Sequence, residues 1–251
     1  MKENHFVFAD LSTYDLSTAK QFYSQVFDWE YITEDGSYHM ATHGGKEIAG
    51  IYETPKKFKD MNMPSFWMSY IQVASVTDTV ARARQLGGII ELVDIKNAGA
   101  IALIRDPLGA GFTIYEGTVL DHRYEDRTNA LVWNELFISN IQKIKPFYEG
   151  IFNWKISKVE GQRYDILNTQ ERTIGNVNVV SNDIKGTYEY WGVFLAVEDM
   201  VVAKSKVVKH GGSLIYEDDH LTALADPFGA FFHILPLEKK NGWSSLLDAF
   251  Y

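Results

Sequence analysis

A few ionisable side chains of this sequence lie within otherwise apolar runs. Glu135 lies in the apolar run 131–138, where burying a carboxylate is costly unless a partner compensates it. His233 lies in a second apolar run, 231–235, and histidine titrates near neutral pH. We therefore interpret Glu135 as a catalytic base. His233 is interpreted as a general acid or base, or as a hydrogen-bonding group for a ligand.

Both residues also have a purely structural interpretation. In it, His233 is a core histidine bonded to a neighbour, and Glu135 caps the turn or helix that follows its strand. Alternation along a strand puts His233 on the face opposite Phe232 and puts Glu135 on the face of Trp133. If both faces line one cleft, Glu135 and His233 can pair across it. The sequence leaves these alternatives open.

These ionisable residues lie in a chain whose sequence is duplicated. Phe22-Tyr-Ser-Gln-Val-Phe-Asp-Trp29 matches Phe147-Tyr-Glu-Gly-Ile-Phe-Asn-Trp154, and Asp106-Pro-Leu-Gly matches Asp226-Pro-Phe-Gly. Two further landmarks, a Trp and a Gly-Gly pair, recur in the same order at nearly the same offset. This spacing indicates two homologous domains of roughly 120 residues each. Asp10 then occupies in the first copy the place that Glu135 has in the second.

Local patterns predict the elements that must position these residues. Apolar spacing indicates helices over 14–27, 76–86, 141–152 and 200–210. Short apolar runs between turn signals indicate strands over 6–11, 28–31, 37–42, 47–52, 66–73, 89–93, 101–104, 111–115, 131–138, 154–158, 164–168, 173–179, 191–197, 214–216, 221–225 and 231–235. Pro146 should kink its helix or mark the first turn. The pattern predicts an α+β fold of paired β-α-β-β-β units, with domains over 1–118 and 130–251 and a linker over 119–129.

Composition narrows the class of protein. The chain has 251 residues, a formal net charge of −9 and no cysteine. The sequence has no Lys/Arg-rich run, so it does not indicate nucleic acid or an anionic membrane as a partner. Cysteine-based disulfides, metal ligation and nucleophilic catalysis are excluded. The first residues have no apolar signal core and no apolar run is long enough to span a bilayer, so we expect a cytoplasmic protein.

Two further features of the sequence suggest interactions. His39 and His43 share strand parity but have no acidic partner nearby, so we interpret them as part of a solvent-facing hairpin. The segment 242–251 carries aromatic and leucine residues at spacings of three and four. We expect a short amphipathic helix that docks on one domain or mediates a homodimer.

The doubled motifs resemble those of the vicinal oxygen chelate superfamily, in particular its tandem glyoxalase/bleomycin-resistance-like proteins. The shared features are Phe-Tyr-x-x-x-Phe-x-Trp after the first strand, Gly-Gly after the second helix, Asp-Pro-x-Gly before the last strand, and Trp133-Asn-Glu-Leu136. The resemblance covers residues 5–116 and 130–237. It implies that each pair of units curls into an open, barrel-like cleft (the glyoxalase/bleomycin resistance/dioxygenase fold) that receives a small molecule.

The resemblance also implies where a metal would be held. In metal-using members, His, Glu or Gln ligands project from particular strands. The corresponding positions here are Phe8, Trp133, Met68, Gly192, Thr113, His233, Gly50 and Asn176. Among them, His233 is the one good ligand type, whereas such sites need about three oxygen or imidazole ligands. We therefore expect neither a metal site nor another cofactor, with a divalent metal as the alternative.

These observations give three hypotheses. The first is a protein that binds a small organic molecule in an apolar cleft without a catalytic metal, through Trp133, Trp191, Tyr164, Asn176, Asp10 and Thr113. The second is a lyase or isomerase of the glyoxalase kind that uses His233 and Glu135, with or without a divalent metal. The third is a non-catalytic dimerising scaffold. The sequence leaves open whether the protein is an enzyme; as one, it would be a lyase, an isomerase or a dioxygenase-like member.

Overall fold

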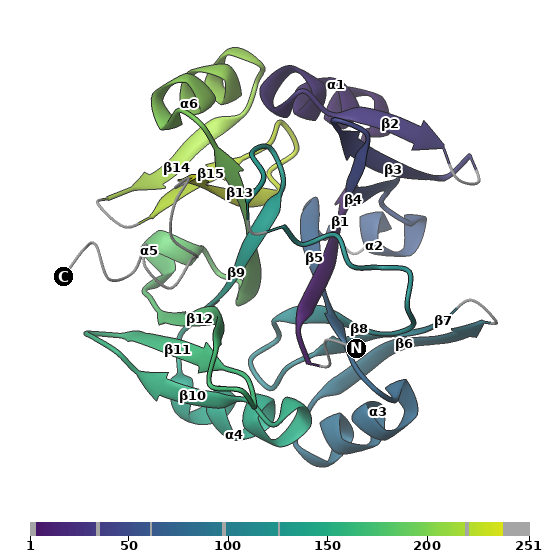
Figure 1. Cartoon of the computed structure of the whole chain (residues 1–251), viewed down its shortest axis with the longest axis vertical. Helices are drawn as coiled ribbons and strands as arrows, with labels where there is room; N and C mark the ends of the chain where they lie inside the picture. Colours follow the sequence, from purple (N-terminus) through teal and green to yellow (C-terminus); the bar gives the residue numbers. More distant parts are fainter. Residues whose placement is uncertain are drawn as a thin grey trace. The chain divides into compact units, whose positions relative to one another are not determined.

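A computed structural model describes residues 4–33, 36–60, 62–96, 99–124, 126–218 and 221–237 of the chain. Its strands form two eight-stranded sheets, in the orders β2-β3-β4-β1-β5-β8-β7-β6 and β10-β11-β12-β9-β13-β16-β15-β14 (Figure 1). The first sheet uses the first half of the chain and the second sheet the second half. The same order of strands in both sheets is the structural form of the sequence repeat.

The elements follow the predicted β-α-β-β-β plan. The first sheet contains β1 (Phe6–Thr13), β2 (Glu30–Thr33), β3 (Tyr38–His43), β4 (Lys46–Glu53), β5 (Phe66–Gln72), β6 (Ile89–Lys96), β7 (Gly99–Arg105) and β8 (Gly111–Glu116). The second contains β9 (Leu131–Ile138), β10 (Lys155–Lys158), β11 (Arg163–Leu167), β12 (Thr173–Val179), β13 (Tyr190–Val197), β14 (Ser213–Glu217), β15 (Thr222–Ala225) and β16 (Phe231–Pro236). The helices are α1 (Leu16–Phe27), α2 (Lys56–Asp60), α3 (Val76–Gln85), α4 (Ile141–Phe152), α5 (Asn182–Lys185) and α6 (Met200–Lys209). The predicted α+β fold of paired units is confirmed.

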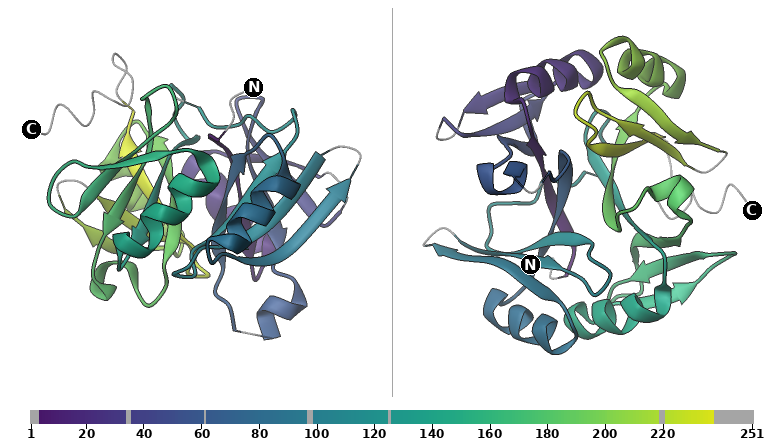
Figure 2. Two further views of the ribbon diagram at one scale, coloured as in Figure 1. Left: turned by 90° about the horizontal axis from the view of Figure 1, so that it is seen from below. Right: turned by 180° about the vertical axis from the view of Figure 1, so that it is seen from behind.

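The chain packs into two compact units, each of which contains parts of both halves of the sequence. Unit 1 comprises Met1–Phe8, Met68–Asp121 and Trp133–Gly192, and unit 2 comprises Ala9–Trp67, His122–Val132 and Val193–Tyr251. In unit 1, α3 packs beside α4; in unit 2, α1 packs beside α6 (Figures 1 and 2). Each helix pair therefore joins an element of one sequence repeat to an element of the other.

Each unit has one hydrophobic core built from both repeats. The unit 1 core joins Ile71 and Phe112 of the first repeat to Phe147 and Trp191 of the second. The unit 2 core likewise joins Phe22 of the first repeat to residues of β13, α6 and β16. Since burial of apolar area is the main stabilising contribution to folding, each repeat contributes to the stability of both units.

The Asp-Pro turns have the predicted conformation. The Oδ1 atom of Asp106 accepts hydrogen bonds from the backbone N–H groups of Leu108, Gly109 and Ala110, at 2.8, 2.8 and 3.0 Å. Gly109 has a φ of 103°, which only glycine adopts at little cost. Asp226 makes the corresponding turn with Gly229. Each turn delivers the chain directly into the last strand of its repeat.

The structure differs from the sequence expectations at several places. The polar connector before β5 forms the short helix α2, and α5 is a second short helix that the sequence pattern did not indicate. Pro146 lies inside α4, which continues through it rather than starting there. His39 is buried, with its Nδ1 atom 3.0 Å from Thr33 Oγ1, so the interpretation of a solvent-facing histidine was wrong at this position.

Two further expectations concern the C-terminal segment and membrane-spanning segments. The segment 242–251, for which we expected a docking helix or a dimer contact, lies outside the described residues. None of the helices that the structure describes has the length and apolar character needed to cross a membrane.

Candidate functional site

Glu135 lies at the centre of a polar network on three neighbouring strands of unit 1. In the parallel pair β9–β12, Glu135 is opposite Asn176. In the antiparallel pair β11–β12, Arg163 is opposite Asn178 and Asp165 is opposite Asn176. Because side chains two residues apart on a strand share a face, these registers bring five polar side chains to one surface of the sheet.

The carboxylate of Glu135 is buried and fully engaged. Its side chain accepts a hydrogen bond from Arg163 Nη2 at 3.0 Å through Oε1, and one from Asn178 Nδ2 at 2.6 Å through Oε2. The residue is only 6% exposed. Such charge-assisted bonds compensate the cost of burying the carboxylate. Glu135 does not cap the following turn or helix, which was its structural interpretation.

Asn176 connects the rest of the network. Its Oδ1 atom accepts hydrogen bonds from Trp133 Nε1 at 2.9 Å and from Arg163 Nη2 at 3.0 Å, and its Nδ2 atom donates to Asp165 Oδ1 at 2.7 Å. The side chain is completely buried. One amide therefore ties the indole, the guanidinium and a second carboxylate into a single arrangement, which limits the rotamers of all of them.

Burial raises the pKa of Glu135 above its ordinary value, and the charge of Asp165 adds to this increase. The Arg163 guanidinium and the hydrogen bonds from Asn178 and Trp133 act in the opposite direction on the same pKa. The remaining shift is upward, so the protonated form of Glu135 is easier to reach than for a carboxyl group in water. A buried acid with a raised pKa is a typical feature of functional sites.

Arg163 is the member of the network that reaches solvent. Its side chain is 25% exposed, compared with 8% for its ion-pair partner Glu135. Both hydrogen bonds that its side chain makes to described residues use Nη2. The Nε and Nη1 donors therefore remain for a ligand or water, since a guanidinium carries five N–H groups in one plane.

An aromatic wall borders the network. The ring of Tyr190 on β13 stacks on Phe137 of β9, with 5.1 Å between centroids. Burial raises the pKa of Tyr190, and the charge of Glu135 raises it further. Tyr190 thus remains a neutral phenol beside the carboxylate.

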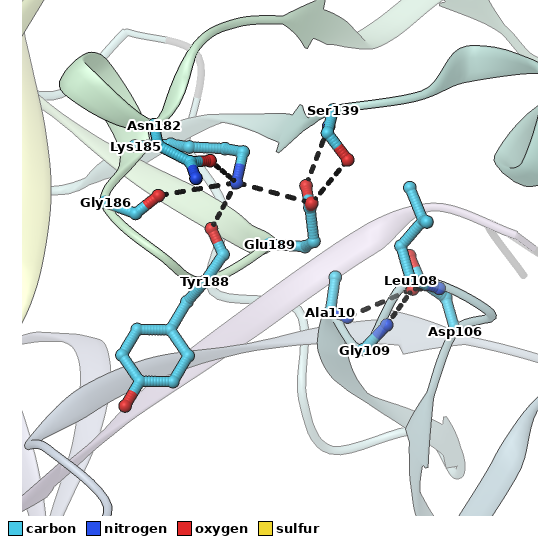
Figure 3. Close-up of polar contacts among 10 residues, drawn as sticks. All are labelled: Asp106, Leu108, Gly109, Ala110, Ser139, Asn182, Lys185, Gly186, Tyr188 and Glu189. Carbon is cyan, nitrogen blue, oxygen red and sulfur yellow. Dashed lines mark hydrogen bonds and ion pairs between the residues drawn. The ribbon is translucent and has the colours of Figure 1, made fainter.

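A buried cation holds the start of β13 in place (Figure 3). Lys185 Nζ lies 3.3 Å from Glu189 Oε1 and donates to Asn182 Oδ1 at 3.0 Å and to two backbone carbonyls. Glu189 in turn accepts hydrogen bonds from the N–H and Oγ of Ser139, at 2.9 and 2.7 Å. Because Ser139 directly follows β9 and Glu189 directly precedes β13, this cluster fixes the two strands that carry Glu135 and Tyr190.

His233 lies in unit 2, whereas Glu135 lies in unit 1. Its ring is fully buried on β16 and stacks on Phe194 of β13, at 4.6 Å between centroids. Burial lowers the pKa of His233 to about 3. The imidazole is therefore neutral over the physiological range, which favours a core histidine over a general acid. Its catalytic role stays a prediction.

Two of the predicted ligand-binding residues belong to the core face of the sheet. Trp191 is buried and donates from Nε1 to the hydroxyl of Tyr148 at 2.8 Å. Tyr164 packs against the unit 1 core, on the face of β11 opposite Arg163 and Asp165. Thr113 is buried on β8 opposite Tyr70. Of the predicted set, the Glu135 network thus includes Trp133 and Asn176.

The first sheet places different side chains at the equivalent register. Asp10 is opposite Gly50 on β4, and Tyr38 is opposite Tyr52, as Arg163 is opposite Asn178 in the second sheet. A Cβ atom on Gly50 would lie 1.8 Å from the hydroxyl of Tyr38. The Tyr38 ring therefore occupies the space that the Asn176 side chain fills in the second sheet. It stacks on Tyr52, at 6.1 Å between centroids.

Sequence reasoning missed Arg163, Asp165 and Asn178. Their signal is the alternation Arg163-Tyr-Asp165 on β11 and Asn176-Val-Asn178 on β12, with a polar residue at every second position. Such alternation normally indicates a solvent-facing strand surface. Only the pairing of both strands with β9 brings these residues beside Glu135.

The donor set around Glu135 does not fit a divalent cation. Both of its oxygen atoms already accept hydrogen bonds, and the positive charge of Arg163 lies 3.0 Å away. Over the described residues, no group of three or more His, Asp or Glu side chains could hold a metal ion.

The fold and parts of the sequence match known proteins. Residues 4–114 match the family described as Glyoxalase/Bleomycin resistance protein/Dioxygenase superfamily. A protein of Mycobacterium tuberculosis (strain CDC 1551 / Oshkosh), named "Putative glyoxylase CFP32", is 30% identical over 243 residues, which cover 90% of this chain and 92% of that protein. "Anthracycline biosynthesis protein DnrV" of Streptomyces peucetius is 23% identical, with 92% of each chain covered.

Solved structures with the same fold include two enzymes. The Mn(II)-bound glyoxalase from Novosphingobium aromaticivorans aligns with a TM-score of 0.65 and 12% identity, over 94% of this chain and 83% of that chain. An extradiol ring-cleaving dioxygenase from B.fuscum aligns with a TM-score of 0.61 and 14% identity, over 92% and 71%. At these identities the similarity concerns the fold alone.

Proposed function

Because this chain belongs to the Glyoxalase/Bleomycin resistance protein/Dioxygenase superfamily, we propose that it binds a small organic acid at the Glu135 network of unit 1, without a metal held by these residues. The observation that carries the proposal is Arg163. Its Nη2 group is held by Glu135 and Asn176, while the side chain is partly exposed with further donors. A fixed guanidinium edge suits a carboxylate, which it can bind through two parallel bonds.

The surroundings suit the rest of such a molecule. Tyr190, whose ring stacks on the buried Phe137, is partly exposed beside the network, and rings of this kind pack well against flat organic groups. The polar side chains of Glu135, Asn176 and Asp165 differ from the apolar cleft lining that we expected from the sequence. We therefore expect an organic acid with a flat apolar part rather than a purely apolar ligand.

A lyase or isomerase activity is the second candidate, and the raised pKa of Glu135 favours it. In the isomerase form of this alternative, Glu135 takes a proton from a hydroxyl-bearing carbon next to a carbonyl group, and Arg163 stabilises the resulting enediolate oxygen. The hydroxyl proton then passes to the former carbonyl oxygen while Glu135 returns its proton to the former carbonyl carbon, which exchanges the positions of the carbonyl and hydroxyl groups. However, both Glu135 oxygens already accept hydrogen bonds, which weakens the residue as a base. Binding is therefore our first choice.

A cytoplasmic location, a homodimer and the domain limits 1–118 and 130–251 stay predictions.

The proposal is tested by titrating the protein with benzoate and with benzamide, which differ in charge but not in shape. Tryptophan fluorescence is a suitable signal because the indole of Trp133 belongs to the network. We expect benzoate to bind at least about tenfold more tightly than benzamide, a difference of about 1.4 kcal/mol. Lowering the pH toward the raised pKa of Glu135 should strengthen benzoate binding, because protonation of Glu135 releases Arg163 from its ion pair.

Variants of Glu135 and Arg163 separate the contributions of these two residues to benzoate binding. Glu135→Gln should bind benzoate more tightly and remove the pH dependence. Arg163→Gln should abolish the preference for the anion, and Arg172→Gln, on the exposed turn after β11, is the matched control. Since Arg163→Gln leaves a buried carboxylate without its cation, the double variant Glu135→Gln/Arg163→Gln provides a stable background. Equal binding of benzoate and benzamide, or an Arg163 variant that keeps the preference, would contradict the proposal.

A further inference from the structure

We propose a second small-molecule site, in unit 2, for a basic amino acid or a similar small zwitterion with an excess of positive charge. The site is a cavity of about 510 Å³ lined by His43, Asp126, Arg127, Thr128, Glu198 and Leu237. Its volume falls within the range of small-molecule sites, roughly 300–1,000 Å³. All six residues belong to unit 2, whereas the Glu135 network belongs to unit 1.

The backbone around the cavity is held by specific hydrogen bonds. The segment before β9 is fixed to β13, because Asn129 N–H donates to the Ala196 carbonyl at 2.7 Å. Leu237 is fixed beside Glu198, because its N–H donates to the Val197 carbonyl at 2.9 Å. The backbone beside the cavity is therefore fixed to β13 at two points.

Arg127 is preorganised in this cavity. Its Nη1 atom donates to the His43 carbonyl at 3.3 Å, and its guanidinium lies over the ring of Tyr124 at 5.4 Å. Tyr124 is itself fixed through a bond from its hydroxyl to the Glu47 carbonyl at 2.8 Å. Gly44, next to His43, has a φ of 55°, a backbone conformation in which a side chain is strained. A guanidinium held in this way can bind a carboxylate with little loss of side-chain entropy.

The charges that line the cavity do not neutralise one another. Within the described ranges, Asp126 and Glu198 form no ion pair with Arg127 or with another cation, and the buried Nδ1 of His43 has no hydrogen-bond partner. Two carboxylates and one guanidinium are matched by a ligand with two cationic nitrogens and one carboxylate. A basic α-amino acid has this pattern, and matched charges give specificity among small ligands.

The test is isothermal titration of the full-length protein with L-lysine and three analogues at physiological salt. L-norleucine lacks the side-chain amine, 6-aminohexanoate lacks the α-amine, and cadaverine lacks the carboxylate. We expect one site for L-lysine per chain and at least about tenfold weaker binding of each analogue. Cadaverine binding as tightly as L-lysine would overturn the proposal, because attraction to the net negative protein would then explain it.

Variants locate the binding in the cavity. Arg127→Met and Glu198→Gln should each weaken L-lysine binding at least about tenfold. Arg84→Met on α3 and Glu30→Gln on β2, both at exposed positions, are the matched controls and should leave it unchanged. Glu198 is exposed, so its variant keeps the fold even if Arg127→Met does not. An unchanged affinity in Glu198→Gln would overturn the proposal. Glu135→Gln should not affect L-lysine binding, which distinguishes this site from the proposed acid site.

Discussion

At the scale of single residues, burial determines which ionisable groups are available for chemistry. Glu135, Asp106 and His233 are all buried, and Glu135 is bonded to a charged side chain, Arg163, that reaches solvent. Asp106 is fully used by its turn and by Tyr148, whose hydroxyl donates to Oδ2 at 2.9 Å. In the proposed function, a ligand would change the state of Glu135 through Arg163, whereas Asp106 affects stability.

Asp106 should make the protein less stable as the pH rises from about 4 to about 6. Burial raises the pKa of Asp106 from 3.8 to about 6. The folded protein thus binds more protons than the unfolded chain in this window, and stability falls as the pH rises. A shift of this size corresponds to up to about 3 kcal/mol.

The measurement is urea unfolding of the wild type and of Asp106→Asn at several pH values in this window. The difference between the free energy of unfolding of Asp106→Asn and that of the wild type should increase as the pH rises. The exposed control Asp183→Asn should show no such trend. His233 acts in the opposite direction, because its lowered pKa causes loss of stability below pH 6.5. Comparing the variant with the wild type cancels that contribution. A constant difference across the window would contradict the assignment.

At the scale of elements, the repeated sequence motifs have a shared structural role. In unit 1, Trp191 on β13 donates to Tyr148 on α4, which donates to Asp106 of the Asp-Pro turn. In unit 2, Trp67 on β5 donates to Tyr23 on α1 at 3.0 Å, and Tyr23 donates to Asp226 at 3.4 Å. Each chain of hydrogen bonds joins the Asp-Pro turn of one repeat to the helix of the other. The Phe-Tyr, Trp and Asp-Pro motifs therefore serve packing of the units.

Removing the tyrosine hydroxyl should cost more in unit 1 than in unit 2. Tyr148→Phe leaves a buried carboxylate oxygen and an indole N–H without this partner, which costs about 1–3 kcal/mol. Tyr23→Phe should cost less, because its bond to Asp226 is longer and hence weaker. Urea unfolding of both variants gives the comparison. An equal loss in both, or a greater loss in Tyr23→Phe, would contradict it.

At the scale of the whole molecule, the duplicated sequence does not give two separately packed halves. Each core contains side chains of both repeats, and each helix pair joins one repeat to the other. The chain can be cut in the predicted linker 119–129, but neither half then contains a complete core.

We expect the fragments 1–118 and 130–251 to unfold without a cooperative transition when each is a monomer, and to regain it when mixed. The reason is the loss of apolar burial in both cores. Circular dichroism during thermal unfolding, combined with mass determination in solution, measures this. A fragment that folds as a dimer agrees with the expectation, since a second copy supplies the missing elements. A monomeric fragment with a cooperative transition would contradict it.

Much of the fold could be predicted because its signals are local. Helix α4 has the predicted limits, with Asn140 capping it through a 2.9 Å bond to Gln142 N–H, and β9 and β12 also have theirs. The helices α2 and α5 were missed because a short helix with a single apolar residue has no apolar periodicity to reveal it. Of the site, Glu135, Trp133 and Asn176 were anticipated, while Arg163, Asp165 and Asn178 were not.

The sequence by itself determined the duplication, the order of elements, the Asp-Pro turns and which side chains of a strand share a face, because these depend on local patterns and their repetition. Tertiary structure alone decided that Arg163 and Asn178 compensate Glu135, that Tyr38 fills the equivalent space over Gly50, and that each core draws on both repeats. Those outcomes depend on which distant strands pair and in what register, and a shift of one residue would turn every side chain to the other face.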